Sequence, residues 1–197
     1  MKKILYHFKK NDPVLYSAAL KLNEPIKRKT SDNYFASLCE SIISQQLSVK
    51  AGDVIYKRFL HLIENNISPE HVLKLTQEQL RNIGISNAKA KYILDLASKV
   101  HNKEVHLELL KNMTEEEVIA ELIKVKGIGQ WTAEMFLMFS LGRDDVFSTG
   151  DLGLKRAIEK LYTIENPSKE LLLEMSKKWS PYRTYAARIL WHSLDNV

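Results

Sequence analysis

The sequence places one carboxylate in a setting that suits chemistry. Asp151 follows a glycine-containing turn and opens a helix-like apolar pattern, in the segment Val146-Phe-Ser-Thr-Gly-Asp-Leu-Gly-Leu154. The partial positive charge of a helix N-terminus keeps such a carboxylate ionised. On these residues alone two interpretations stay open: a helix-capping aspartate, and a fixed negative charge beside a substrate for which the glycines leave room.

A second segment has the residue types that bind phosphate. It reads Leu122-Ile-Lys-Val-Lys-Gly-Ile-Gly-Gln-Trp-Thr-Ala133, with a predicted helix on each side of the glycines. Gly127 and Gly129 allow a positive φ and the close approach of another backbone, and Ile128 can tuck between the helices. Backbone N–H groups at the start of the second helix, from Gln130 on, point outward and suit a phosphate. An ordinary glycine-capped helical hairpin is the alternative interpretation.

The composition excludes several kinds of site. The 197 residues include a single cysteine, Cys39, which excludes disulfides within the chain, a cysteine zinc site and a four-cysteine iron–sulfur cluster. The six histidines show no metal-ligand spacing, which disfavours a metal-dependent nuclease. No apolar run approaches the roughly 18 residues of a membrane span, and the lysine-rich start lacks the pattern of a secretory signal. We therefore expect an intracellular protein with no membrane partner.

The positive charge is concentrated at the start of the chain. The net charge is +5, from 29 Lys and Arg against 24 Asp and Glu. Residues 1–30 carry a surplus of 6 positive charges, and residues 31–197 have a net charge of −1. We expect a basic N-terminal segment over 1–30 that packs on the core, and one helical domain over 31–195. Because the basic segment alone explains the net charge, an inference of DNA binding has to rest on local features.

The elements that must position these segments are helices. Apolar residues recur at a helical spacing throughout, and the chain has only 7 glycines and 5 prolines, so we predict an all-α fold of nine or ten helices with short connections. Capping boxes that begin at Thr76 and Thr114 mark two helix starts, and Ser68-Pro69 marks a third. The longer predicted helices cover about 31–46, 48–63, 87–101, 114–125, 130–141, 151–162, 168–179 and 182–194.

Taken together, the motifs resemble a known family. A Gly-Ile-Gly hairpin, then a buried helix, then an Asp-containing turn is similar to the helix–hairpin–helix (HhH-GPD) DNA glycosylases. Three segments resemble the DNA-3-methyladenine glycosylase II branch: Ile42-Ile-Ser-Gln-Gln-Leu-Ser48, Val125-Lys-Gly-Ile-Gly-Gln-Trp-Thr-Ala133 and Trp179-Ser-Pro-Tyr-Arg-Thr-Tyr-Ala-Ala-Arg-Ile-Leu-Trp191. The resemblance covers about residues 30–195. It implies a two-lobed helical fold with the active site in the cleft between the lobes. Some members carry an additional N-terminal β-rich domain, for which this chain is too short.

The resemblance assigns the chemistry to Asp151. An N-alkylated purine is a cationic leaving group, so its release builds positive charge at the sugar C1′, which a fixed carboxylate stabilises while it orients water. Bifunctional relatives place a nucleophilic lysine where this chain has Trp131, so the resemblance implies base hydrolysis without lyase activity. Trp131 and Trp191 match base-pocket positions, where aromatic faces hold a cationic base. Met135 and Leu152 stand where relatives have tyrosines, which makes the expected pocket less aromatic.

The resemblance also implies how DNA is held. Gln46, or else Gln45 or Leu47, matches the side chain that fills the hole left by a flipped base. The hairpin residues Gly127, Ile128, Gly129 and Gln130 match the phosphate-binding positions. Relatives bind an alkali cation, Na⁺ or K⁺, through hairpin carbonyls, which by position are those of Ile123, Val125 and Ile128. We expect no required cofactor and no iron–sulfur cluster.

The prediction from the sequence is therefore a monofunctional DNA glycosylase. It would excise alkylated purines of the 3-methyladenine and 7-methylguanine type from double-stranded DNA and so initiate base-excision repair, as a monomer. We expect it in the cytoplasm or nucleoid of a bacterium or archaeon, or in the nucleus of a eukaryote. Two alternatives stay open: a non-catalytic helix–hairpin–helix DNA-binding module, and a glycosylase for a different base lesion.

Overall fold

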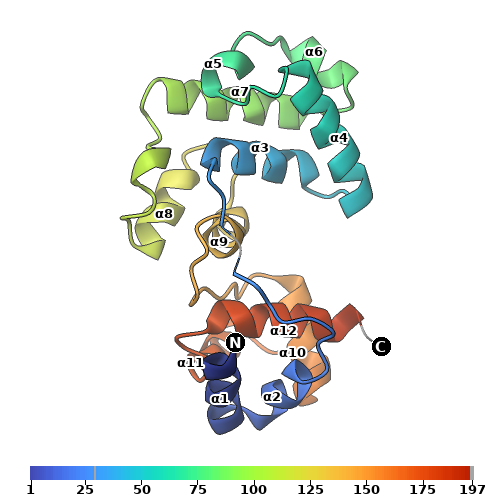
Figure 1. The fold of residues 1–197 in the computed structure, drawn as a ribbon, viewed down its shortest axis with the longest axis vertical. Helices are drawn as coiled ribbons and strands as arrows, with labels where there is room; N and C mark the ends of the chain where they lie inside the picture. The colour runs from blue at the N-terminus through green and yellow to red at the C-terminus, as the bar shows by residue number, and fades with distance from the viewer. Residues whose placement is uncertain (29, 196–197) are drawn as a thin grey trace. The chain divides into compact units, whose positions relative to one another are not determined.

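The computed structural model of the chain describes residues 1–28 and 30–195. Within these residues the regular elements are twelve α-helices and one short 3₁₀ helix, which confirms the predicted all-α fold (Figure 1). No helix in this described part is both long and apolar enough to cross a bilayer. The helices form two compact units. We call Thr30–Leu141 the central unit, and Met1–Lys29 with Gly142–Val197 the terminal unit.

The central unit contains the hairpin. In chain order its helices are α3 (Tyr34–Ser44), α4 (Val49–Leu62), α5 (Pro69–Val72), α6 (Gln77–Asn82), α7 (Asn87–His101), a 3₁₀ turn (Leu107–Leu109), α8 (Glu115–Leu122) and α9 (Gln130–Phe139). Helix α7 packs against α3, α5 and α6, and α9 packs against α3 and α8. The apolar stripe of α3 is buried, as its periodicity predicts. Both predicted capping boxes are present, at Thr76 and Thr114.

Some helix ends differ from the predicted ones for local reasons. Helix α3 begins at Tyr34, later than predicted, because the Asn33 side chain accepts the Ala36 N–H at 2.9 Å and caps the helix. Helix α8 ends at Leu122 rather than near residue 125. There the Val125 N–H donates to the Leu122 carbonyl, three residues back, at 3.1 Å. This bond closes a 3₁₀-type turn, which is tighter than an α-helical turn.

The terminal unit combines the two ends of the chain. Its helices are α1 (Lys2–Asn11), α2 (Pro13–Ala19), α10 (Leu152–Tyr162), α11 (Lys169–Lys177) and α12 (Arg183–Asp195), with α12 packed against α10 and α2. No helix is predicted for residues 1–30, yet two form there. Phe8 and Leu15 are fully buried, so this basic segment contributes part of the apolar core, while the four lysines of α1 are exposed.

A buried carboxylate joins the N-terminal helices to the rest of the terminal unit. Asp12 is 2% exposed. It accepts hydrogen bonds from the Leu15 N–H at 3.0 Å, the Tyr162 hydroxyl at 2.6 Å and the Trp179 indole at 2.7 Å, and it pairs with the Lys178 ammonium at 2.9 Å. Burial acts to raise the pKa of Asp12, but these bonds outweigh it, and the pKa lies below its usual value.

We predict that Asp12→Asn destabilises the protein by about 2 kcal/mol or more at pH 7, because an amide cannot replace an ion that accepts several buried hydrogen bonds. Urea denaturation measures this difference. Because folding lowers the pKa of Asp12, its contribution is present above the unfolded pKa of about 3.9 and is lost as the pH falls through the folded value. The two proteins should therefore converge in acid. Equal denaturation midpoints at pH 7 would contradict the role assigned to this carboxylate.

Candidate active site and phosphate-binding hairpin

The terminal unit brings Asp151 and Trp191 together. Asp151 is the N-cap of α10, and its Oδ1 accepts the Leu154 N–H at 2.7 Å. The same oxygen accepts the indole N–H of Trp191, from α12, at 2.9 Å. Asp151 is 8% exposed. Two donors from two helices thus fix one carboxylate oxygen, and with it the orientation of the negative charge.

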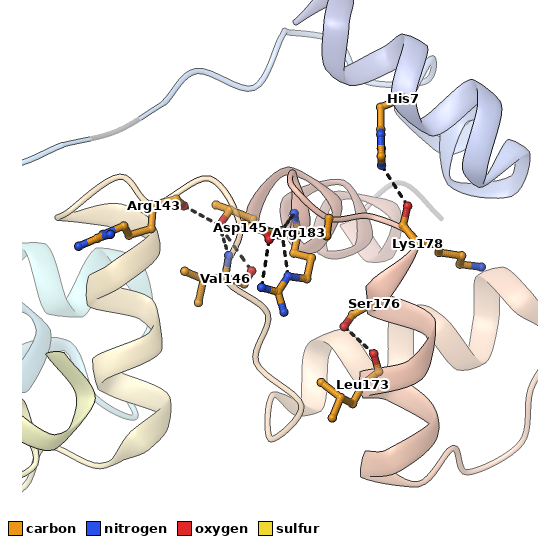
Figure 2. Close-up of polar contacts among 10 residues, drawn as sticks. His7, Arg143, Asp145, Val146, Leu173, Ser176, Lys178 and Arg183 are labelled. Carbon is orange, nitrogen blue, oxygen red and sulfur yellow. Dashed lines mark hydrogen bonds and ion pairs between the residues drawn. The ribbon is translucent and has the colours of Figure 1, made fainter. Parts of the chain in front are cut away.

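Helix α12 also holds the loop that leads to Asp151. Arg183 donates to Asp145 through its Nε at 2.8 Å and through a terminal guanidinium nitrogen at 3.1 Å (Figure 2). The Thr184 hydroxyl donates to the Arg143 carbonyl at 2.7 Å and accepts the Val146 N–H at 3.1 Å. Burial acts to raise the pKa of Asp145, but the Arg183 bonds outweigh it and keep the pKa below its usual value. Arg183 therefore binds a carboxylate of its own unit.

A glycine lies where α10 approaches Trp191. A Cβ at Gly153 would lie 3.0 Å from Asp151 Oδ1 and 3.1 Å from a ring carbon of Trp191, so a larger residue there would press on the carboxylate and the indole. Beside Asp151 a cavity of about 380 Å³ opens in the terminal unit, with Leu152 and Lys155 in its lining. Leu152 is 69% exposed. This residue, which the resemblance leads us to expect at a tyrosine position, thus lines the same cavity as the carboxylate.

The two glycines of the hairpin in the central unit differ in their surroundings: Gly127 has no space for a side chain, whereas Gly129 faces open space. Gly127 has φ +83°, and a Cβ there would lie only 2.1 Å from the Tyr92 ring. Ile128 is 4% exposed, in the tucked position that its place between two glycines suggests. Gly129 is the N-cap of α9, with no side-chain cap, and a Cβ there would meet nothing within 4 Å. The start of α9 is therefore accessible to another backbone.

The segment between α3 and α4 contacts the hairpin. Gln45 follows the last residue of α3, and its side-chain amide donates to the Gly127 carbonyl at 2.9 Å. Gln46 is exposed and has φ +56°, and Leu47 is 39% exposed. We call Gln45–Leu47 the plug segment. Of its three candidates, Gln45 is bonded to the hairpin, whereas Gln46 and Leu47 present exposed side chains.

The hairpin carbonyls suit the predicted alkali cation, since oxygen is the ligand type of hard cations. The Lys124 carbonyl accepts the Lys99 ammonium at 2.7 Å. The Val125 carbonyl, one of the three predicted ligands, accepts the Ile128 N–H at 3.1 Å and keeps a second lone pair for an ion. No group of three or more His, Cys, Asp or Glu that could hold a metal occurs in the described residues. The cation stays a prediction that rests on backbone oxygens.

Trp131 lies in the first turn of α9 and is 47% exposed, and Met135 on the same helix is half-buried. Both belong to the central unit, whereas Asp151 and Trp191 belong to the terminal unit. Each unit thus assembles its own part of the predicted site. Sequence reasoning missed the contacts that support these parts, that of Arg183 with Asp145 above all, because the partners are distant in sequence.

The comparisons with known proteins define the class of protein. The family described as HhH-GPD superfamily base excision DNA repair protein matches residues 39–181. The chain therefore belongs to the HhH-GPD superfamily of base-excision DNA repair proteins.

Particular relatives narrow this class. The chain is 34% identical to a putative DNA-3-methyladenine glycosylase, YfjP, of Bacillus subtilis, over 80% of this chain and 58% of that protein. It is also 34% identical to DNA-3-methyladenine glycosylase 1 of Schizosaccharomyces pombe, over 80% of this chain and 71% of that protein. The chain thus spans less than two thirds of the length of the Bacillus subtilis relative.

Solved structures agree with the fold. A DNA-3-methyladenine glycosidase from Bacillus halodurans has a TM-score of 0.84 and 38% identity, with 96% of this chain and 88% of that chain covered. The 3-methyladenine DNA glycosylase Mag1 of Schizosaccharomyces pombe, solved in complex with abasic DNA, has a TM-score of 0.81 and 30% identity, with 96% and 95% covered.

The two hairpin glycines should respond differently to alanine. Gly129→Ala should change the free energy of unfolding by less than about 0.5 kcal/mol, because its Cβ enters open space, but it should weaken duplex binding by obstructing a phosphate. Gly127→Ala should cost more than about 1 kcal/mol, because of its positive φ and the Tyr92 ring. Thermal denaturation and fluorescence anisotropy with a duplex measure the two effects. Unchanged DNA affinity of Gly129→Ala would contradict phosphate approach at this position.

Proposed function

We propose that this protein is a monofunctional DNA glycosylase that hydrolyses the N-glycosidic bond of alkylated purines, of the 3-methyladenine and 7-methylguanine type, in double-stranded DNA. The observation that carries the proposal is the Asp151 carboxylate, fixed by Leu154 and Trp191 at a helix N-terminus. Membership of the superfamily and relatives named for 3-methyladenine support it. We further propose that it acts as a monomer, in the compartment that holds the genome.

The chemistry requires a fixed negative charge more than a strong acid. As the bond between C1′ and the alkylated base breaks, its electron pair moves to the cationic purine, which leaves as a neutral base. Positive charge develops at C1′, and a preorganised carboxylate stabilises it without reorganising. Water then attacks C1′ and gives up a proton, for which Asp151 is the acceptor. Hydrogen bonds from Leu154 and Trp191 keep the carboxylate oriented through these steps.

The residues of the hairpin support hydrolysis without strand cleavage. A lyase needs a primary amine at C1′ to form a Schiff base, and position 131 is a tryptophan. The neighbouring lysines lie near carboxylates of their own unit: the Lys124 ammonium is 2.5 Å from Glu121, and the exposed Lys126 ammonium is 4.0 Å from Asp95. An aromatic side chain at this position instead suits the flat face of a cationic base.

We expect Asp151→Asn to lower the rate of base release at least about a hundredfold, because it removes the charge that stabilises the transition state. Asparagine caps a helix as well as aspartate does, so the variant should fold and bind duplex DNA as the wild type does. The assay measures free base released from DNA that carries 3-methyladenine or 7-methylguanine. Glu165→Gln, an exposed carboxylate in the same unit, is the matched control. Wild-type release by Asp151→Asn would overturn the mechanism.

Sodium borohydride tests the monofunctional assignment separately. A Schiff base would be reduced to a stable covalent complex between protein and DNA. We expect borohydride to trap no complex during wild-type base release. We also expect the wild-type protein to leave the abasic strand uncut. A trapped complex would show that an amine attacks C1′.

A further inference from the structure

One face of α7 contacts both the hairpin and the plug segment. Four side chains spaced along this face bond to, or pack on, one or the other: Lys89, Tyr92, Asp95 and Lys99. Residues three or four positions apart share a helix face. Helix α7 therefore presents a continuous support to two segments that lie far apart in the sequence.

Lys89 holds the end of α3 and the start of the plug segment. Its ammonium donates to the Ile43 carbonyl at 2.8 Å and to the Gln45 carbonyl at 2.6 Å. The last carbonyls of a helix lack partners within the helix and carry partial negative charge, so a cation suits them. Burial lowers the pKa of the Lys89 ammonium, which agrees with its partial withdrawal from water. Hydrogen bonds from a charged donor are the stronger kind.

The other three side chains hold the hairpin. The Tyr92 ring occupies the space beside Gly127, and Asp95 accepts the Lys126 N–H at 2.9 Å. The Lys99 ammonium donates to the Lys124 carbonyl at 2.7 Å. These contacts hold the turn between α8 and α9.

The two segments are also tied to each other. Gln45, which directly precedes Gln46, donates from its side-chain amide to the Gly127 carbonyl at 2.9 Å. Gln46 itself has φ +56°, a conformation that residues other than glycine keep only where their surroundings hold them. Lys89 is bonded to the preceding carbonyl and supplies part of that restraint.

We propose that Lys89 is a positioning residue for base flipping, which keeps the plug segment in register with the hairpin so that phosphate binding and filling of the vacated base position occur together. This inference rests on the proposed function. A segment ordered before binding loses less conformational entropy when it engages DNA. Lys89 acts through Gln46 and Leu47, since its ammonium is bonded to protein carbonyls.

The test compares lesions that need a plug with lesions that do not. Single-turnover release of 7-methylguanine is measured from two duplexes, one with the lesion paired with cytosine and one with the lesion in a single-nucleotide bulge. A bulged base leaves no unpaired partner when it flips, and its unstacking is already partly accomplished. Lys89→Met keeps the length of the side chain and removes the donor. Lys91→Met, at an exposed lysine of the same helix, removes the same charge and is the matched control.

We expect Lys89→Met to slow release from the paired lesion about tenfold, the typical effect of losing a charge-assisted hydrogen bond, and to change release from the bulged lesion less than about twofold. Lys91→Met should match the wild type on both, and Lys89→Arg should restore most of the paired rate. Lys89→Gln, which removes the charge but keeps a polar side chain, provides a second variant should Lys89→Met fold poorly, with the same selective loss.

Equal losses on both duplexes, or no loss on either, would overturn the inference while leaving the glycosylase assignment intact. Absence of release from both duplexes by the wild type would overturn the proposed function, and this inference with it.

Discussion

The proposed chemistry depends above all on the fixed orientation of the Asp151 carboxylate, which the helices of the terminal unit hold in place. Its Oδ1 is held from two sides, by the first turn of α10 and by Trp191 of α12. Where the two helices meet, residue 153 is a glycine, and a Cβ there would make tight contacts with both Asp151 and Trp191. Arg183 and Thr184, at the start of α12, hold the preceding loop. In the same unit, Asp12 joins α2 to the end of α10 and to the turn before α12.

The basic residues do not mark a DNA-binding face as simply as the net charge suggests. Lys89 and Lys99 donate to carbonyls of their own unit, and Arg183 pairs with Asp145. Several cations thus stabilise the segments proposed to hold DNA. The proposed phosphate site itself consists of backbone N–H groups at Gly129 and the start of α9. The net charge would then add a general, salt-dependent attraction to DNA, and the hairpin would fix where the protein sits along the DNA backbone.

Local signals in the sequence predicted the local parts of the structure. The capping boxes at Thr76 and Thr114, the glycine hairpin and the N-cap position of Asp151 follow from neighbouring residues, and each is present. The supporting contacts leave no such pattern. Asp12 lies 150 residues before Tyr162, and Lys89 lies 44 residues after Gln45, so nothing nearby in the chain indicates either pair. No helix is predicted at α1 and α2, although Ile4 and Phe8 of α1 have a helical spacing and are buried, because α1 and α2 are short and their stability comes from packing in the terminal unit.

The central claim is that Asp151 promotes hydrolysis by stabilising positive charge at C1′. The most direct measurement compares the affinities of two abasic-site analogues in duplex DNA, one a cationic pyrrolidine and one a neutral tetrahydrofuran. The cationic analogue resembles the transition state and should bind at least about tenfold more tightly, and Asp151→Asn should abolish that preference while it still binds the neutral analogue. Equal affinity of the wild type for both analogues, or a preference that persists in Asp151→Asn, would contradict the account.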